Sequence, residues 1–431
     1  MAKKSNAKRL AAKKANATTV ASNAATDATE KKPESRKYNF LIRTIWTFIM
    51  IGGFFAVLAS GHIWCVMLIL LCQIAIFMEC IAVTSGSSRE RDLPLTKTLN
   101  WYFLITTIYY LEGSSLFRFL EPAFYKYTLL RMVVEHHKFI CYCFYVFGVV
   151  LFVCSLRKGH LKFQFASLCI THMVMLFVVA QAYLVTKNVL NGLFWFLLPC
   201  GLVIVNDIFA YLCGITLGRT KLIAISPKKT LEGFLGAWFF TALASIILTR
   251  LLSPYMYLTC PVQDLHTNFF SNLTCDLNPV FLKQDYKTPP FIAEKYGINV
   301  ITVKPIYFHA LNLATFASLV APFGGFFASG LKRAFKVKDF GHSIPGHGGI
   351  TDRVDCQILM GSFTYLYYTT FINERGITIE SIISTILINF NEKQIIEIVL
   401  RLNKKLLESG LLEKKEFKSI GQIYSKCADR L

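Results

Sequence analysis

Two aspartates, Asp352 and Asp355, stand three residues apart where an apolar run begins. If that run forms a helix, both carboxylates project from one face of its first turn and can bind the same cation. Acidic groups near a helix N-terminus also keep their charge easily. Helix capping and an ion pair with Arg353 would explain one aspartate, but not two that follow the glycines Gly348 and Gly349. We therefore interpret Asp352 and Asp355 as ligands of a hard cation such as Mg²⁺.

The residues before this pair are basic and rich in glycine. The cations are Lys332, Arg333, Lys336 and Lys338, and Asp339 follows them directly. Lysines at a membrane boundary can simply anchor a helix, which is the interpretation that we favour for Lys336. Gly348 and Gly349 let backbone N–H groups approach an anion closely. His347 could bind phosphate, orient a carboxylate or carry a proton.

A second polar segment lies earlier in the chain. Asn206 and Asp207 sit inside an apolar run, where an ionisable group is costly unless it has a partner or a function. An interhelical hydrogen bond or an ion pair is the structural alternative, but a neutral residue could serve that purpose at lower cost. Downstream, a turn leads into a helix start, with polar residues at Ser226, Lys228, Lys229, Thr230 and Glu232. Lysines there suit phosphate oxygens, although such a turn could equally be a solvated loop.

The elements that must position these residues are membrane helices. The chain has 431 residues, of which 54% are hydrophobic and 17% charged, and its mean hydropathy is +0.46. This composition predicts an all-α, polytopic membrane protein. Runs of roughly 20 residues can cross a bilayer, and we expect about nine such spans. They are residues 40–60, 62–84, 100–117, 138–156, 163–185, 189–212, 234–252, 306–328 and 354–373.

Charge sets the expected orientation. The basic tail should stay in the cytosol, and basic connections after every second span return to that side. Both polar segments, and hence the active site, then face the cytosol. The basic connection from Arg118 to Lys138 disagrees with this count. The net charge of +20 is explained by cytosolic loops and an anionic substrate, so we expect no nucleic-acid partner.

Four regions follow from these patterns. They are a disordered basic tail (1–37), N-terminal transmembrane helices (38–160), a catalytic transmembrane domain (161–373) with a lumenal loop (253–305), and an amphipathic helical tail (374–431). The loop holds a glycosylation sequon at Asn272, and its cysteines Cys260 and Cys275 can pair if it lies in an oxidising lumen. The side of the membrane on which the last tail lies is left open.

Carboxylates for magnesium, fixed cations and flexible backbone at a membrane surface fit phosphoryl or nucleotidyl transfer involving a lipid. The segment from Ser329 to Asp355 resembles the signature of the phosphatidate cytidylyltransferases (CDP-diacylglycerol synthases), S-x-apolar-K-R-x4-K-D-x-G-x2-[IL]-P-x-H-G-G-x2-D-R-x-D, with every spacing kept. The segment from Asn206 to Gly233 is similar to the family's ND…AY…G…G…K…ISP-K-T-EG pattern. The lead-in APFGGFFASG is typical of the eukaryotic branch. Bacterial members carry an aspartate near Gly325, so one of their acidic ligands has no counterpart here.

This resemblance implies that CTP and phosphatidate react to give CDP-diacylglycerol and pyrophosphate, with Mg²⁺ required. It implies that Asp352 and Asp355 hold the metal, with Asp207 as a further acidic group. The cations that would offset substrate charge are Lys229, Lys332, Arg333, Lys338 and Arg353. Asp339 would fix Lys338 or the glycine loop, and His347 would act beside them. The substrate-binding residues would be Asn206, Ser226, Lys229, Thr230, Glu232, Gly348 and Gly349. The phosphatidate phosphate is already ionised, so no strong general base is needed.

The resemblance also implies a multi-pass protein of the endoplasmic reticulum membrane that binds membrane lipid and could form a homodimer. Two alternatives stay open. A CTP-dependent polyprenol kinase would transfer the terminal phosphate of CTP, so the products of labelled CTP distinguish it. A lipid transporter or scaffold could use Asp207 to line a pathway, and it would keep its function after Asp355→Asn.

Overall fold

The computed structural model describes residues 33–84, 93–124, 127–223, 226–262, 267–271, 273–287, 294, 297, 299–373, 382–383, 386, 390–410, 415 and 417. The chain divides into two compact units, residues 1–366 and 367–431, and each is considered by itself. The expected basic tail lies outside the described residues except for its last few positions, which begin the first helix.

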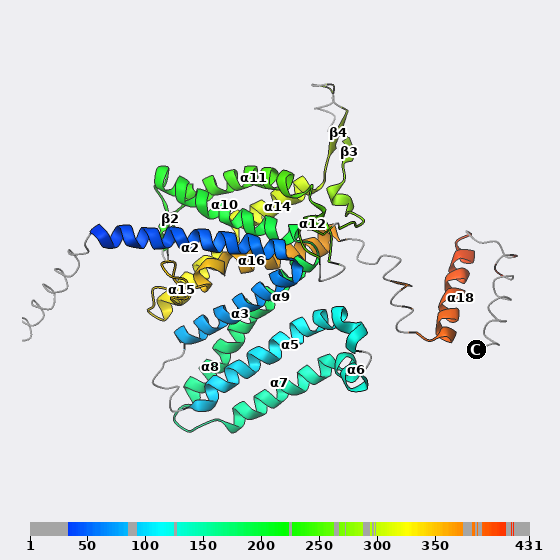
Figure 1. The fold of residues 1–431 in the computed structure, drawn as a ribbon, viewed down its shortest axis with the longest axis horizontal. Coiled ribbons are helices and arrows are strands. Elements are labelled where there is room, and N and C mark those ends of the chain that lie inside the picture. The colour runs from blue at the N-terminus through cyan, green and yellow to red at the C-terminus, as the bar shows by residue number, and fades with distance from the viewer. Residues whose placement is uncertain are drawn as a thin grey trace, which may run out of the picture. The chain divides into compact units, whose positions relative to one another are not determined.

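Helices dominate the first unit, as the composition predicts (Figure 1). They are α2 (Pro33–Ser60), α3 (His62–Thr84), α5 (Pro94–Phe124), α6 (Thr128–Glu135), α7 (His137–Cys154), α8 (Leu161–Val174), the π-helix η1 (Met175–Val179), α9 (Ala180–Leu190), α10 (Phe194–Thr216), α11 (Leu231–Leu252), α12 (Met256–Thr259), the 3-10 helix η2 (Pro279–Phe281), α14 (Ile306–Leu319), α15 (Pro322–Ala334) and α16 (Thr351–Tyr367). Two small antiparallel hairpins join them. β1 (Lys221–Ile223) pairs with β2 (Ser226–Thr230), and β3 (Gln284–Lys287) pairs with β4 (Val300–Val303).

Seven helices of the described part are long and apolar enough to cross a membrane: Leu41–Ser60, His62–Thr84, His137–Cys154, Leu161–Leu190, Phe194–Thr216, Leu231–Leu252 and Ile306–Ala334. Each coincides with one of the nine expected spans. The other two are also helical, since residues 100–117 lie within α5 and residues 354–373 within α16 and the π-helix η3 (Tyr368–Ile372). However, neither α5, which contains Glu112 and Arg118, nor α16 is among the seven.

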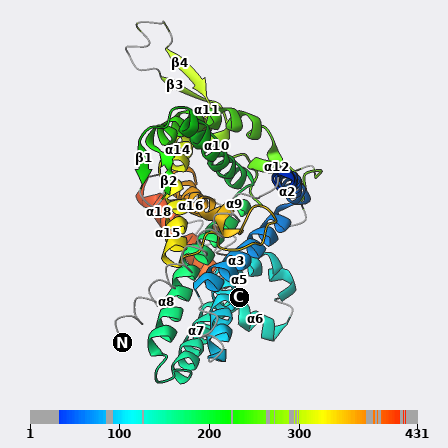
Figure 2. The same ribbon diagram turned by 90° about the vertical axis from the view of Figure 1, so that its left-hand side faces the viewer.

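The helices of the first unit pack in two groups (Figures 1 and 2). In one group, α10 packs against α11 and α14. In the other, α5 pairs with α7, and a shared core that includes Phe77, Phe103 and Val179 joins α5 to α3 and η1. Because α3 also packs on α8 and α9, it is held on several sides. The position of α3 is therefore fixed by several neighbours, although its sequence alone predicts only an apolar span.

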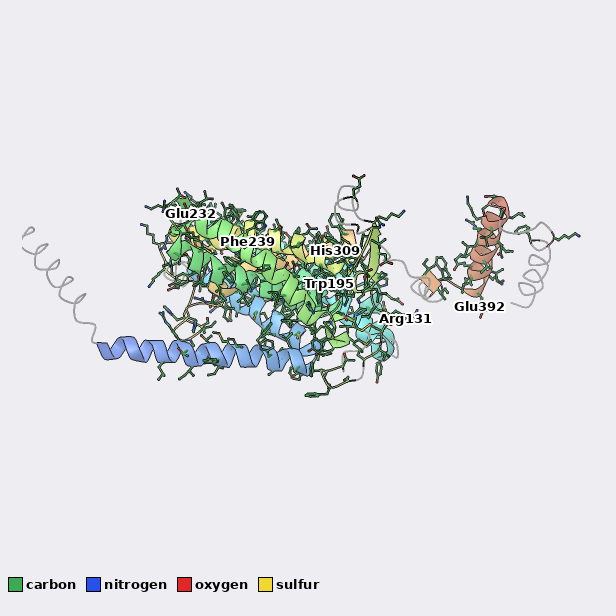
Figure 3. The ribbon with its side chains drawn as sticks, turned by 90° about the horizontal axis from the view of Figure 1, so that it is seen from above. Arg131, Trp195, Glu232, Phe239, His309 and Glu392 are labelled. Carbon is green, nitrogen blue, oxygen red and sulfur yellow. A yellow bond between two sulfur atoms is a disulfide. The ribbon has the colours of Figure 1, made fainter. Side chains whose placement is uncertain are left out.

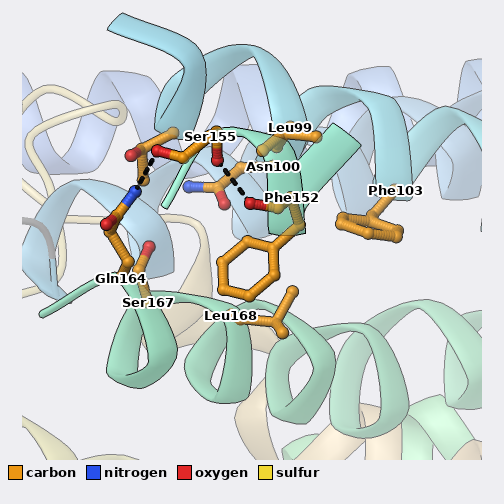
Figure 4. Close-up of a pocket in the computed structure, with 9 residues that line it drawn as sticks. Leu99, Asn100, Phe103, Phe152, Ser155, Gln164, Ser167 and Leu168 are labelled. Carbon is orange, nitrogen blue, oxygen red and sulfur yellow. Dashed lines mark hydrogen bonds between the residues drawn. The ribbon is translucent and has the colours of Figure 1, made fainter. Parts of the chain in front are cut away.

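The turn between α7 and α8 shows how buried polar groups are satisfied at a helix end (Figure 4). The Gln164 side chain donates to the Ser155 carbonyl at 3.0 Å and accepts from the Arg157 N–H at 3.0 Å. About two turns further on, the Thr171 hydroxyl donates to Asn100 of α5 at 2.9 Å. Unpaired carbonyls at a helix C-terminus would otherwise be costly in an apolar surrounding. These contacts tie α8 to α5.

A disulfide closes the loop after α11, where Cys260 is bonded to Cys275 with their Cα atoms 6.0 Å apart. The pairing that the sequence left open is therefore present. Beside it, the Tyr257 hydroxyl donates to the Leu58 carbonyl at 2.6 Å, and burial raises the pKa of Tyr257 to about 12, so the phenol stays a donor. Asn272 of the expected sequon lies outside the described residues.

The second unit contains α18 (Glu392–Glu408), which is the helix expected within the C-terminal tail. Asn391 and Gln394 form a reciprocal capping box at its start, which satisfies two backbone N–H groups. Ion pairs between Glu397 and Arg401 and between Lys405 and Glu408 run along its surface. Within the predicted amphipathic tail, these residues are thus helical.

Candidate active site

The first polar segment forms a tight junction between α10 and α11. The Thr230 hydroxyl caps α11 by accepting from the Gly233 N–H at 3.2 Å. The Glu232 carboxylate accepts from the backbone N–H groups of Arg219 at 3.0 Å and Thr220 at 3.1 Å, and from the Thr220 hydroxyl. Both predicted substrate-binding side chains are thus bonded within the protein. Their observed contacts position β2, and with it Lys229.

Lys229 extends from the end of β2 towards α10 and α15. Its Nζ lies 3.9 Å from Oδ1 of Asp207 and 5.6 Å from the ring centre of Phe326. The side chain of Asp207 is 52% exposed, whereas the neighbouring Asn206 is 2% exposed and its Oδ1 has no hydrogen-bond partner among the described residues. Ser226 is half-buried at the start of β2. The ion pair expected as the structural alternative for Asp207 is therefore present, but it is long and exposed.

Asp352 and Lys332 form the closest ion pair of the second segment. Lys332 Nζ lies 2.6 Å from Oδ1 of Asp352, and the two side chains are only 15% and 8% exposed. The other oxygen of Asp352 accepts from the Phe340 N–H at 3.1 Å. Both oxygens of this predicted metal ligand therefore have partners in the protein. To bind a cation, Asp352 would have to exchange the ammonium group for the metal.

Asp355 has a different environment, although it stands on the same helix. Its Oδ1 accepts from the Cys356 N–H at 2.8 Å, and its Oδ2 faces Gly325 of α15, where an added Cβ would lie 3.3 Å away. Asp355 is within electrostatic range of Asp207 and Lys332. A side chain at position 325 would therefore crowd this carboxylate and the Sγ of Cys356, which would lie 3.2 Å from the added Cβ.

The glycine-rich loop between α15 and α16 is held by a residue that the sequence reasoning missed. Glu79 of α3 accepts from the Ile350 N–H at 2.9 Å, from the Thr351 N–H at 2.9 Å and from the Thr351 hydroxyl at 2.7 Å, and also from the Ser343 hydroxyl. A signal existed, because Glu79 is an ionisable residue inside an apolar run, like Asp207.

His347 lies on the outer side of the loop, beside α2. Its Nε2 is 3.2 Å from the Thr47 hydroxyl, and the Arg353 guanidinium donates to the His347 carbonyl at 2.8 Å. Gly348, with φ at +86°, forms an antiparallel bridge with Ile344, so its N–H is used within the loop. A substrate role for this glycine pair stays a prediction.

The two polar segments meet at one end of the first unit. The structure brings together Asp207, Lys229, Lys332, Asp352, Arg353 and Asp355. Arg333 and Lys338 lie exposed at the rim, and neither forms a salt bridge with a residue that the structure describes. Asp339 is half-buried, with its carboxyl group facing Gly348.

The described carboxylates do not form a complete Mg²⁺ site by themselves. Within the described ranges, no three acidic, histidine or cysteine side chains are arranged as a ready-made metal site. Mg²⁺ in nucleotide enzymes is commonly held by one or two carboxylates together with substrate phosphates. Asp355 and Asp207, which interact across α16 and α10, supply such a pair. The donor set is therefore suited to a metal that arrives with a nucleotide.

Comparisons with known proteins agree with this chemistry. The family model described as the cytidylyltransferase family matches residues 41–371. The phosphatidate cytidylyltransferase of Saccharomyces cerevisiae is 72% identical over 399 residues, which cover 93% of this chain and 87% of that protein. The putative phosphatidate cytidylyltransferase of Schizosaccharomyces pombe is 47% identical over 385 residues, covering 89% and 88%. Phosphatidate cytidylyltransferase 1 of Homo sapiens is 40% identical over 380 residues, covering 88% and 82%.

Proposed function

Because this chain belongs to the cytidylyltransferase family, we propose that its site carries out the phosphatidate cytidylyltransferase reaction. CTP and phosphatidate are the substrates, and CDP-diacylglycerol and pyrophosphate are the products. The observation that carries this proposal is the meeting of Asp207 and Asp355 with lysines from both signature segments, in a chain whose relatives with that name match it over most of its length.

In the reaction, an ionised oxygen of the phosphatidate phosphate attacks the α-phosphorus of CTP, and the bond to the β-phosphate breaks to release pyrophosphate. When bound, Mg²⁺ would neutralise charge on the triphosphate. Asp355 and Asp207 would hold the metal, and Asp352 would complete the set only by releasing Lys332. Lys229, Lys332 and Arg353 offset the negative charge that builds up on the phosphate oxygens.

The remaining predicted residues take supporting roles. Arg333 and Lys338 stand exposed beside the loop and bind the phosphatidate headgroup from the membrane surface. Asp339 and His347 shape the loop around the substrates, through Gly348 and Thr47 respectively. Asn206, Ser226, Thr230 and Glu232 support the nucleotide side of the site. Thr230 and Glu232 do so by fixing the helix junction that carries Lys229.

The protein acts in the endoplasmic reticulum membrane with the site facing the cytosol. The distribution of lysine and arginine in the connections between spans supports this orientation. Cytosolic CTP and membrane phosphatidate would then meet at one surface. We also propose that two copies can associate as a homodimer, which the mass of the detergent-solubilised protein would test.

The decisive experiment is turnover by the purified protein in detergent with phosphatidate and CTP labelled at the α-phosphorus. The label should enter CDP-diacylglycerol with release of one pyrophosphate per product, and chelation of divalent metal should stop both. Label that stays in soluble CDP, with transfer of the terminal phosphate to a lipid, would instead identify a lipid kinase. Absence of any CTP-dependent product would contradict the proposal.

A further inference from the structure

Glu79 occupies the N-terminus of α16 from another helix. The first N–H groups of a helix have no partner within it, and they need an acceptor from elsewhere. Glu79 receives the Ile350 and Thr351 N–H groups at 2.9 Å each, and its negative charge matches the positive end of the helix. A carboxylate from α3 therefore serves as the cap that the local sequence does not provide.

This cap has a consequence for where substrates bind. Helix N-termini commonly bind phosphate through the same N–H groups. Here Glu79 already uses two of them, and the residue is only 7% exposed. The Ile350 and Thr351 N–H groups are therefore not open to the phosphates of CTP and phosphatidate, which the nearby lysine and arginine side chains would bind instead.

The glycine loop is built closely around the same carboxylate. A Cβ on Gly341 would lie 2.9 Å from Oε1 of Glu79, and one on Gly349 would lie 2.7 Å from Oε2. The Ser343 hydroxyl also donates to Oε1. One side chain thus holds both ends of the loop, and glycine is required where the backbone passes it.

Asp352 and Asp355 follow directly from this anchored point. Since α16 begins at Thr351, any shift of the Thr351 backbone moves both aspartates. It also moves the Lys332 ammonium, which is bonded to Asp352 at 2.6 Å. The order of contacts runs from Glu79 to the helix start, then to the carboxylates and the lysine.

We propose that Glu79 is a positioning residue for this site. It holds the glycine loop and the start of α16 so that Asp355 faces Asp207 and Lys332 is presented to the substrates. The inference rests on the proposed cytidylyltransferase reaction. It goes further because Glu79 lies outside both segments that carry the chemistry.

The first test compares Glu79→Gln with Glu112→Gln, the same change at a carboxylate on α5 that interacts with Thr186 and Lys187. A glutamine amide can accept from one pair of donors only, so Glu79→Gln should lower kcat/KM for CTP at least about 10-fold. It should also raise the Mg²⁺ concentration needed for half-maximal rate. Hydrogen exchange of residues 341–351 should become faster. Glu112→Gln should stay within about twofold of the wild type in all three measurements.

The second test uses size compensation and stays informative if Glu79→Gln fails to accumulate. The three nearest atoms to a Cβ at Gly341 all belong to the Glu79 side chain. Gly341→Ala should therefore lower activity at least about 10-fold. Adding Glu79→Asp withdraws the carboxylate by one methylene, so the double variant should be at least about threefold more active than Gly341→Ala alone.

Two results would overturn the proposal. One is Glu79→Gln at normal abundance with unchanged kcat/KM, Mg²⁺ dependence and hydrogen exchange. The other is a Gly341→Ala, Glu79→Asp double variant with no more activity than Gly341→Ala alone. Wild-type turnover is measured in the same assay, so a failure of the proposed reaction appears there, independently of either variant.

Discussion

Asp352 and Asp355 lie on one face of α16, but their carboxylates make different contacts. Asp352 uses both oxygens within the protein, on Lys332 and on the Phe340 N–H. Asp355 accepts from the Cys356 N–H with one oxygen, and its other oxygen faces Gly325, within range of Asp207. Spacing alone made the two aspartates equivalent. Their contacts make Asp355 the better candidate for binding the metal and Asp352 the residue that orients Lys332.

Asp355→Asn should abolish CTP-dependent activity, with a loss of at least about 100-fold, because a neutral amide is a poor magnesium ligand. The protein should still insert into the membrane at normal abundance. Asp276→Asn, the same change at an exposed aspartate of the loop after α11, is the matched control and should have wild-type activity. Substantial turnover by Asp355→Asn would instead show that other residues hold the metal.

The ion pair between Lys332 and Asp352 should also contribute to the free energy of unfolding. Breaking a buried pair leaves an uncompensated charge, which costs about 3–5 kcal/mol. Lys332→Met and Asp352→Leu should each lower the free energy of unfolding in a denaturant titration by this order, and the double variant should lose less than their sum. Strictly additive losses would show that the two groups do not interact in solution.

At the scale of elements, the junction of α10 and α11 depends on glycine. A Cβ on Gly233 would lie 2.8 Å from the Ala210 carbonyl oxygen and 2.9 Å from the Thr230 hydroxyl. The two helices can therefore approach closely at this end, and the Thr230 cap lies between them. The close approach sets the direction in which β2 presents Lys229 towards Asp207.

Gly233→Ala should push α11 away from α10 and raise the KM for CTP several-fold. Gly201→Ala on α10 is the control, because its Cβ would meet only Leu248 at 3.4 Å. Alanine improves helix propensity by about 1 kcal/mol at both positions, so a difference between the variants reports the packing. Equal kinetics for the two variants would show that the junction tolerates the displacement.

At the scale of the whole first unit, the site and the disulfide stand at opposite ends of the same helices. Figure 3 shows Glu232 at one end and Trp195 at the other. The 23 residues of α10 span roughly 35 Å, which is close to the thickness of a bilayer core. Gly192, just before α10, lies against the backbone of Thr259 and Cys260. A membrane would therefore separate the two ends, as we propose for the cytosol and the lumen.

Removal of the disulfide should change stability but not catalysis. The cysteines are 15 residues apart, and closing a loop of that length is worth about 3 kcal/mol. Cys260→Ser should lower the free energy of unfolding by this order and leave kcat/KM for CTP unchanged. Cys143→Ser, at an exposed free cysteine of α7, should change neither quantity. A large kinetic effect of Cys260→Ser would show that the two ends are coupled.

The sequence by itself determined the helical membrane fold, the paired aspartates and the basic segments. These depend on apolar run length and on spacing within one segment, which are local properties. Seven of the expected spans meet the criteria of length and hydropathy, whereas α5 and α16 do not. The local pattern could not decide whether these two helices cross the membrane, because a short or polar helix is stabilised by the helices packed around it.

Only the tertiary structure decided how the candidate residues divide their roles. Asp207 approaches Asp355, and Glu79 reaches the start of α16, because α16 contacts both α10 and α3, which are far from it in the sequence. No spacing rule specifies such contacts. The hydrogen bonds of a buried carboxylate depend on which N–H groups the fold brings to it. For that reason Glu79 read as an isolated charge in an apolar run until the packing of α3 against the loop was known.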